Sequence, residues 1–156
     1  MGHIIGVLGG VLVGLAILAG AAGGLYSAFS KNNIANTEEN LVLLRMQTQS
    51  FFLGTNYDGL SNEVAINAGI VPEGFLRGGS MRNAWGGDIT LSPDTANGQF
   101  SIELANIPQQ ECTQLARFQG DAWAGVAVNG SDVDPADPAA VAQVCGETNT
   151  LTFTAR

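Results

Sequence analysis

The chain has 156 residues, of which 46% are hydrophobic and 13% charged, and its formal net charge is -8. This length suffices for one domain with a sizeable core, or for a smaller domain with an appended helix. Every acidic residue lies at or after Glu38, so the negative charge belongs to the C-terminal part. An acidic globular part repels phosphate backbones, and we therefore expect no direct binding of nucleic acid.

The N-terminal segment is apolar and carries no charged side chain from Ile4 to Phe29. A membrane-spanning helix needs about 20 apolar residues, and this run is longer. An uncleaved signal peptide is an alternative, but the residues before the run include neither Lys nor Arg, whereas a signal peptide begins with a positive region. We therefore expect Met1 to be the mature N-terminus, left after removal of a shorter basic leader.

Glycine is frequent in this apolar segment, although each glycine costs about 1 kcal/mol of helix stability relative to alanine. Gly6, Gly10 and Gly14 are spaced four apart, so they share one helix face, and small residues there let helices approach closely. The pattern favours tight packing among many copies, with a plain membrane anchor as the alternative. The residues expected to pack in a filament core are Ile4, Ile5, Gly6, Gly10, Val11, Gly14, Leu15 and Leu18.

A single helix is predicted from about residue 3 to about residue 53, because no proline precedes Pro72. Its weakest part holds Gly20, Gly23 and Gly24, which are candidates for local unwinding. Such a helix would be roughly 75 Å long, too long for a domain of about 100 residues to bury. Its projecting half needs lipid or neighbouring copies of itself.

The second half of this helix is predicted to be amphipathic. One stripe of its surface holds Ile34, Leu41, Leu44, Thr48 and Phe52. The expected organisation is therefore an apolar membrane or filament-core half at residues 1–30, an amphipathic half at 31–53 and a globular domain at 54–156.

The globular part alternates short helices and strands. Gly54 is predicted to stop the long helix, and Ser61 to cap a short one. Residues 72–80 are predicted to form a loop, and residues 86–93 and 99–106 an antiparallel hairpin around the turn 94–98. A helix follows at 108–118, with Pro108 at its first position. The remaining predictions are a strand and turn at 121–130, an acidic loop leading into a short helix that ends near Cys145, and a final strand at 149–155. The predicted class is α+β, with one long helix packed on a mainly antiparallel β-sheet.

The sequence offers no catalytic constellation, since its one histidine, His3, lies in the apolar segment and a Ser-His-Asp site needs a histidine near its nucleophile. We expect neither a cofactor nor a metal. Asp132, Asp134 and Asp137 fit the start of a calcium loop only loosely, because Pro135 follows Asp134 and the terminal glutamate is missing. A solvated loop is the favoured interpretation.

The two cysteines, Cys112 and Cys145, lie in the globular part without the spacing of a zinc site. One disulfide is favoured over two free thiols, and it implies an oxidising compartment outside the cytoplasm.

Three stretches resemble one family over nearly the whole chain. They are FFLGTNYDGLSNEVAINAGIVPEGF, NAWGGDITLSPDTANGQFSIELANIPQQEC and PADPAAVAQVCGETNTLTFTAR. With the long helix, they resemble the type IV pilins, in particular the type IVb group that includes bundle-forming and conjugative thin-pilus pilins. The resemblance implies that Cys112 and Cys145 form the disulfide bounding the family's variable C-terminal region.

The resemblance also implies a function and partners. The chain is expected to be the major subunit of a type IV pilus, a helical homopolymer of itself on a bacterial cell surface. Before assembly it would lie in the inner membrane and meet the pilus assembly machinery. The alternatives are a single-pass membrane-anchored binding protein and a pseudopilin of a secretion system.

The chain departs from the family at position five, where Ile5 replaces the usual glutamate. That glutamate is thought to pair with the N-terminal amine of a neighbouring subunit. A buried ammonium would here need another partner or lose its proton. His3 is a candidate substitute, although a solvated histidine is the favoured interpretation.

Overall fold

The computed structural model describes residues 22–156, and their side chains from residue 31 onward. The chain divides into two compact units, Met1–Asn33 and Ile34–Arg156, and we call the second the globular unit. Helix α2 (Ala22–Phe51) confirms the predicted helix over these residues and ends two residues earlier than expected. The predicted helical residues 3–21 lie outside the described part. Among the residues described, no helix is both long and apolar enough to cross a membrane.

The face of α2 that enters the core is the predicted stripe. Ile34, Leu41, Leu44, Thr48 and Phe52 are all buried. Their spacing places them on one side of the helix, where apolar side chains gain free energy by leaving water. The predicted buried stripe of this helix half is confirmed.

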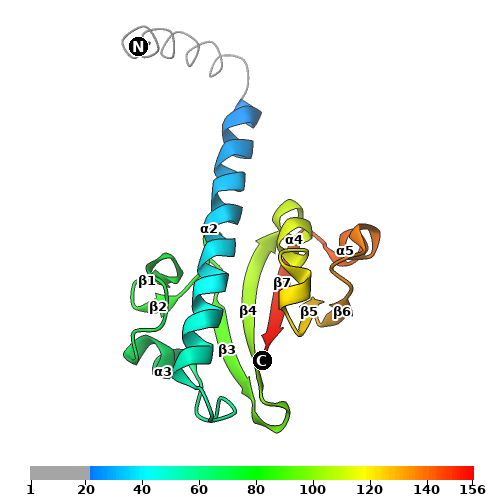
Figure 1. The fold of residues 1–156 in the computed structure, drawn as a ribbon. Coiled ribbons are helices and arrows are strands. Elements are labelled where there is room, and N and C mark those ends of the chain that lie inside the picture. Colours follow the sequence, from blue (N-terminus) through cyan, green and yellow to red (C-terminus); the bar gives the residue numbers. More distant parts are fainter. Residues whose placement is uncertain (1–21) are drawn as a thin grey trace, which may run out of the picture. The chain divides into compact units, whose positions relative to one another are not determined.

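A five-stranded sheet forms the other half of the core (Figure 1). Its order is β3 (Ile89–Asp94), β4 (Gln99–Pro108), β7 (Thr148–Ala155), β5 (Gly125–Val128) and β6 (Ser131–Val133). All neighbouring strands are antiparallel. The C-terminal strand β7 is central, so the last residues of the chain pair with strands on both sides. The α+β class and the predicted strands around β3, β4, β5 and β7 are confirmed.

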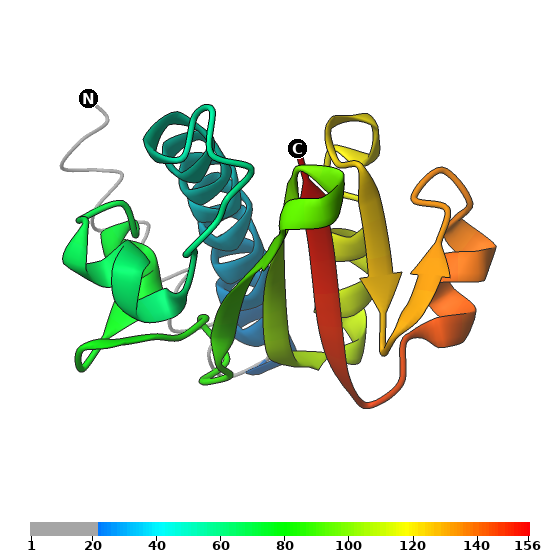
Figure 2. The same ribbon diagram turned by 90° about the horizontal axis from the view of Figure 1, so that it is seen from below.

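One face of the sheet is covered and the other is open. In β7, Leu151, Phe153 and Ala155 are buried, while the threonines between them are half-buried. Figures 1 and 2 show α2 and α4 (Gln109–Ala116) on the same side of the sheet. The hydrophobic core therefore lies between these helices and the apolar face of the strands.

Two short helices begin at side-chain caps, of which Ser61 was predicted and Asp137 was not. In α3 (Asn62–Asn67), the Ser61 hydroxyl accepts a hydrogen bond from the main-chain N–H of Val64. In α5 (Pro138–Val144), the Asp137 carboxylate accepts one from Ala140. Three single turns of 3-10 helix complete the unit, at Glu73–Phe75, Thr95–Asn97 and Gly120–Ala122.

Two predicted loops are wrong, because each contains a hairpin strand. The loop predicted at 72–80 holds β1 (Leu76–Arg77), which pairs with β2 (Ser80–Met81). The acidic loop begins with β6, which pairs with β5. Both hairpins turn on two residues with positive φ, Gly78-Gly79 and Asn129-Gly130, which suit the tight two-residue turn of a hairpin. Strands of two or three residues are too short to show an alternating pattern.

Pro108 does not occupy the first helical position that the sequence predicted. It pairs with Thr148 as the last residue of β4, and its ψ of 162° is extended. Proline needs no hydrogen-bond partner for its nitrogen, so it can end a strand directly before a helix. Cys112 lies within α4, as predicted.

The segment Asn83–Gly87 closes against β4 through one buried amide side chain. Asn83 Oδ1 accepts hydrogen bonds from the N–H groups of Trp85 (2.9 Å) and Gly87 (3.1 Å). Its Nδ2 donates to the carbonyl of Ala105 at 2.7 Å. A Cβ on Gly87 would collide with that same carbonyl oxygen. The sequence Asn83-Ala84-Trp85-Gly86-Gly87 thus forms a turn that admits only glycine at its end.

Gly87→Ala is expected to lower the free energy of unfolding by about 3 kcal/mol, because the main chain of β4 must move to admit the methyl group. Denaturant unfolding of the full chain in detergent measures the change. Gly125→Ala is the matched control, since a Cβ there meets nothing within 4 Å. Equal losses in the two variants would contradict the steric explanation.

Candidate assembly surface

Large apolar side chains are exposed at the C-terminal end of α2. Among the described residues five large hydrophobic side chains are exposed, and four lie on one stretch: Leu43 (39%), Met46 (56%), Phe51 (54%) and Leu53 (84%). We call these four residues the exposed apolar stretch. Leu43 and Met46 are three residues apart and therefore neighbours on the helix surface, away from the buried stripe. Exposed apolar side chains that are neighbours on a surface, such as Leu43 and Met46, mark contact surfaces more often than scattered ones.

The same part of α2 is held by Arg45 to the turn that precedes β5. Its guanidinium lies 4.6 Å from the ring centroid of Trp123, and its nitrogens donate to the carbonyl of Ala122 (3.5 Å) and to Gln119 Oε1 (3.4 Å). Partial burial lowers the pKa of Arg45 below its ordinary value. One turn later, Gln49 Nε2 donates to the carbonyl of Arg156 at 2.6 Å. These contacts hold α2 against the turn that precedes β5 and against the residue that follows β7.

Arg45→Ala is expected to destabilise the globular unit by about 1 kcal/mol, through loss of the contact with the Trp123 ring. Tryptophan fluorescence should report greater solvent access at Trp123 in the folded state. Arg45→Lys is the control, because it keeps the charge but loses the planar group. An unchanged emission spectrum in Arg45→Ala would show that the ring contact does not hold this region.

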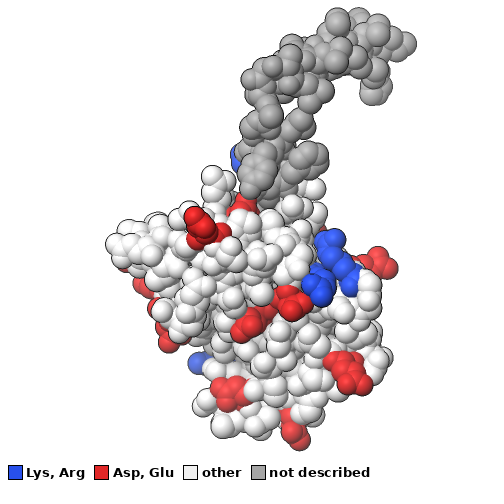
Figure 3. Space-filling view, turned by 180° about the vertical axis from the view of Figure 1, so that it is seen from behind, with Lys and Arg blue, Asp and Glu red and all other residues white. Residues whose placement is uncertain are grey.

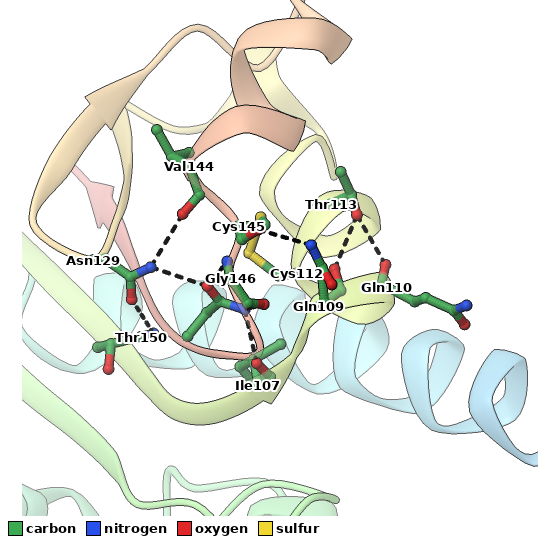
Figure 4. Close-up of a disulfide and its surroundings, with 11 residues drawn as sticks. Ile107, Gln109, Gln110, Cys112, Thr113, Asn129, Val144, Cys145, Gly146 and Thr150 are labelled. Atoms are coloured by element: carbon green, nitrogen blue, oxygen red, sulfur yellow. Dashed lines mark hydrogen bonds between the residues drawn. A yellow bond between two sulfur atoms is a disulfide. The ribbon is translucent and has the colours of Figure 1, made fainter.

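A disulfide joins Cys112 of α4 to Cys145, which follows α5, and closes a loop with a sequence separation of 33 (Figure 4). The chain around Cys145 is also held by side-chain amides. Gln109 Nε2 donates to the Cys145 carbonyl (3.1 Å), and Asn129 Nδ2 to the carbonyl of Val144 (3.1 Å). The buried Asn149 accepts from the N–H of Gly146 (2.7 Å). The C-terminal region is thus tied to α4 and β5 by covalent and polar contacts together.

An open cleft of about 500 Å³ lies between α3 and strands β2 and β3. Asn62, at the start of α3, uses its amide to bond the edge of β3: Nδ2 donates to the carbonyl of Ile89 (2.7 Å), and Oδ1 accepts from Leu91 (2.8 Å). Pro93, two residues further along the strand, has no N–H. The β3 edge of the sheet is therefore blocked against pairing with another strand.

Figure 3 shows acidic side chains spread over one face of the molecule, one larger group of basic side chains, and smaller basic areas apart from it. In the acidic segment, Asp134 accepts a hydrogen bond from the main chain of Ala136, and Asp137 caps α5. Within residues 22–156, no three His, Cys, Asp or Glu side chains are grouped so that they could hold a metal ion. The carboxylates of Asp134 and Asp137 instead accept hydrogen bonds from nearby main-chain N–H groups.

Burial raises the pKa of the half-buried Glu38, on α2, above its ordinary value. Burial therefore favours the protonated form more in the folded chain than in the unfolded chain. The resulting loss of stability is absent at low pH and complete above the raised pKa. Glu38→Gln is expected to raise the free energy of unfolding at pH 7 by less than about 1 kcal/mol, and with it the melting temperature slightly. At pH 3 neither quantity should change. Thermal unfolding at the two pH values measures this, with the exposed Glu39→Gln as control. A gain that persists at pH 3 would contradict the burial argument.

Comparison with models of protein families shows which family the chain belongs to. The family model described as PilS N terminal matches residues 31–156, which is most of the chain. The chain belongs to this family. The predicted resemblance to type IV pilins of the type IVb group is thereby confirmed. A comparison with curated proteins found no match.

Solved structures show the same pilin fold. The type IVb pilin of Salmonella typhi is similar with a TM-score of 0.64 and 24% identity, over 76% of this chain and 97% of the other. TcpA, a type IV pilin of the Vibrio cholerae El Tor biotype, is similar with a TM-score of 0.55 and 14% identity, over 80% and 99%. At these identities the likeness concerns the fold.

The pilin-family residues predicted from sequence fall in two groups. Cys112 and Cys145 are bonded, as predicted. Gly23 and Gly24 lie in helical residues of α2, and Gly20 lies outside the described residues, so the unwinding stays a prediction. The predicted filament-core residues also lie outside the described part: Ile4, Ile5, Gly6, Gly10, Val11, Gly14, Leu15 and Leu18.

Sequence reasoning missed the side chains that organise the globular unit. Asn62, Asn83 and Asn149 replace main-chain hydrogen-bond partners, and Arg45 contacts Trp123 from a distant part of the sequence. The exposed apolar stretch was also missed, although Leu43, Met46 and Leu53 can be seen in the sequence beside the buried stripe. A helical projection would have placed Leu43 and Met46 opposite the buried stripe.

Proposed function

We propose that this chain is the major structural subunit of a type IVb-like pilus, an extracellular helical filament built from many copies of itself. The observation that carries the proposal is membership of the PilS N-terminal family over residues 31–156. The pilin fold of the globular unit agrees with it. The chain performs no catalysis in this proposal, and its work is to bury apolar surface once per subunit.

The apolar half of the helix, residues 1–30, is assigned to the filament core. Its uncharged run from Ile4 to Phe29 suits a bilayer, where we place the chain before assembly. In the filament, the apolar helix half of each subunit would leave lipid and contact the apolar halves of other subunits. How closely these helices fit together would then decide how the subunits are arranged. The glycine face at Gly6, Gly10 and Gly14 lets backbones approach, because dispersion contacts replace the missing hydrophobic drive.

Residues 31–53 and 54–156 are assigned to the amphipathic half of the helix and the outer globular domain. The exposed apolar stretch at the end of α2 supports self-association, because four large apolar side chains stay uncovered in the single chain. A contact between two different surfaces, repeated with a fixed rotation and rise, gives an open fibre. A subunit of such a fibre needs one apolar surface that a neighbour covers.

A single-pass membrane-anchored binding protein and a pseudopilin remain the competing functions. An experiment on the glycine face separates the first from a pilin. Gly6→Leu, Gly10→Leu and Gly14→Leu together are expected to abolish filaments, because leucine prevents close approach of the arms. Membrane fractionation should still find the variant in the inner membrane. Normal filaments from the triple variant would contradict the packing role.

The copy number of the subunit separates a pilin from a pseudopilin, which assembles only short fibres. Quantitative mass spectrometry of the sheared cell-surface fraction is expected to find this chain as its most abundant component. A trace amount beside a different major subunit would favour the pseudopilin.

A further inference from the structure

The sequence contains two Asn-Gly pairs, Asn97-Gly98 and Asn129-Gly130. An asparagine followed by glycine can lose its side-chain amide without an enzyme, because glycine has no Cβ to hinder approach of its nitrogen. The main-chain nitrogen of glycine bonds to Cγ of asparagine, the Cγ–Nδ2 bond breaks, and ammonia leaves with the proton of that nitrogen. Water then opens the cyclic imide to aspartate or isoaspartate.

Both asparagines are exposed, so access of water does not distinguish them. Hydrogen bonding of the reacting carboxamide does. Asn97 ends the 3-10 turn between β3 and β4, and its Nδ2 donates to Asp94 Oδ2 at 2.8 Å. The N–H of Gly98 makes a long hydrogen bond of 3.3 Å to the carbonyl of Thr95. Little therefore holds the Asn97 carboxamide and the attacking nitrogen apart.

Both Oδ1 and Nδ2 of the Asn129 carboxamide make hydrogen bonds (Figure 4). Its Oδ1 accepts from the N–H of Thr150 at 2.9 Å. Its Nδ2 donates to the carbonyl of Val144 (3.1 Å) and to Asn149 Oδ1 (2.9 Å). Rotation of Cγ toward the Gly130 nitrogen would break all three bonds, and these bonds anchor the chain beside the disulfide.

We propose that Asn97 is a site of spontaneous deamidation in the folded protein, and that Asn129 is protected by its three hydrogen bonds. The new carboxylate at position 97 stands next to Asp94, where the amide of Asn97 now donates. Like charges replace a hydrogen bond, and the tip of the β3–β4 hairpin loosens. The fraction of molecules deamidated at Asn97 thus increases with time after synthesis, while the turn at Asn129 stays unmodified.

The two sites can be measured in one sample. Trypsin cleaves after Arg82 and Arg117, so after reduction of the disulfide the two Asn-Gly pairs fall in different peptides. The full chain in detergent is kept at pH 8 and 37 °C, and mass spectrometry follows aspartate and isoaspartate at each site. Asn97 is expected to react at least about tenfold faster than Asn129, from two extra hydrogen bonds at Asn129.

Two controls isolate the role of the fold. In denaturant the two sites are expected to react at similar rates, because the same dipeptide is then free in both places. Asn149→Ala, which removes one acceptor from Asn129, is expected to speed the reaction at Asn129 while leaving Asn97 unchanged. Equal rates at both sites in the folded chain would overturn the proposal, as would a difference that persists in denaturant.

Discussion

Leu43→Glu combined with Met46→Glu is expected to abolish filament formation while the globular unit stays folded. Both side chains are exposed, so a charge there costs the single chain little. In a filament contact the two carboxylates would be buried without partners, at a combined cost of at least about 3 kcal/mol. That loss raises the concentration needed for assembly by roughly 100-fold. Electron microscopy and sedimentation of sheared material measure the filament yield.

Val64→Glu is the matched control, because Val64 is the one other large hydrophobic side chain exposed among the described residues and lies in α3. Val64→Glu also replaces an exposed apolar side chain by a carboxylate, but outside the exposed apolar stretch. Circular dichroism should report native folding in both variants. Normal filaments from the double variant would show that this stretch is not a contact surface, and equal loss in both variants would show that added charge alone prevents assembly.

Cys112→Ala combined with Cys145→Ala is expected to lower the free energy of unfolding by about 3–4 kcal/mol. The disulfide closes a loop with a sequence separation of 33, and the estimate follows from the chain entropy that such a loop removes from the unfolded state. Alanine is preferred to serine because both cysteines are buried, and a hydroxyl would be desolvated there. Denaturant unfolding in detergent gives the value.

The wild-type chain measured with reductant is the control for the disulfide, since it loses the bond while keeping both sulfurs. We expect it to lose a similar amount of stability. Asn149→Ala in the double alanine background should add a further loss, because Asn149 holds Gly146 independently of the sulfurs. A combined loss below about 1 kcal/mol for the two alanines would mean that the polar contacts alone hold this region.

Long periodic elements could be predicted from the sequence. The buried stripe of α2 and the alternation in β7 each extend over several residues, so burial leaves a clear period in the sequence. Strands β1, β2 and β6 have two or three residues and show no period. Their turns were the available signal, because Gly78-Gly79 and Asn129-Gly130 both suit a two-residue hairpin turn.

The polar contacts of the globular unit could not be predicted, because each joins distant parts of the chain. Arg45 meets Trp123, and Asn149 donates to the carbonyl of Ile107 across the irregular register between β4 and β7. An asparagine in a sequence is equally typical of an exposed turn. Only the fold shows which asparagines lie beside main-chain groups that lack a strand partner.

The most direct test of the central claim is electron microscopy of material sheared from cells that express the chain, with mass spectrometry of the same fraction. Our account predicts thin fibres whose principal component is this chain. High expression of the chain with no fibres, or fibres made of another protein, would contradict it.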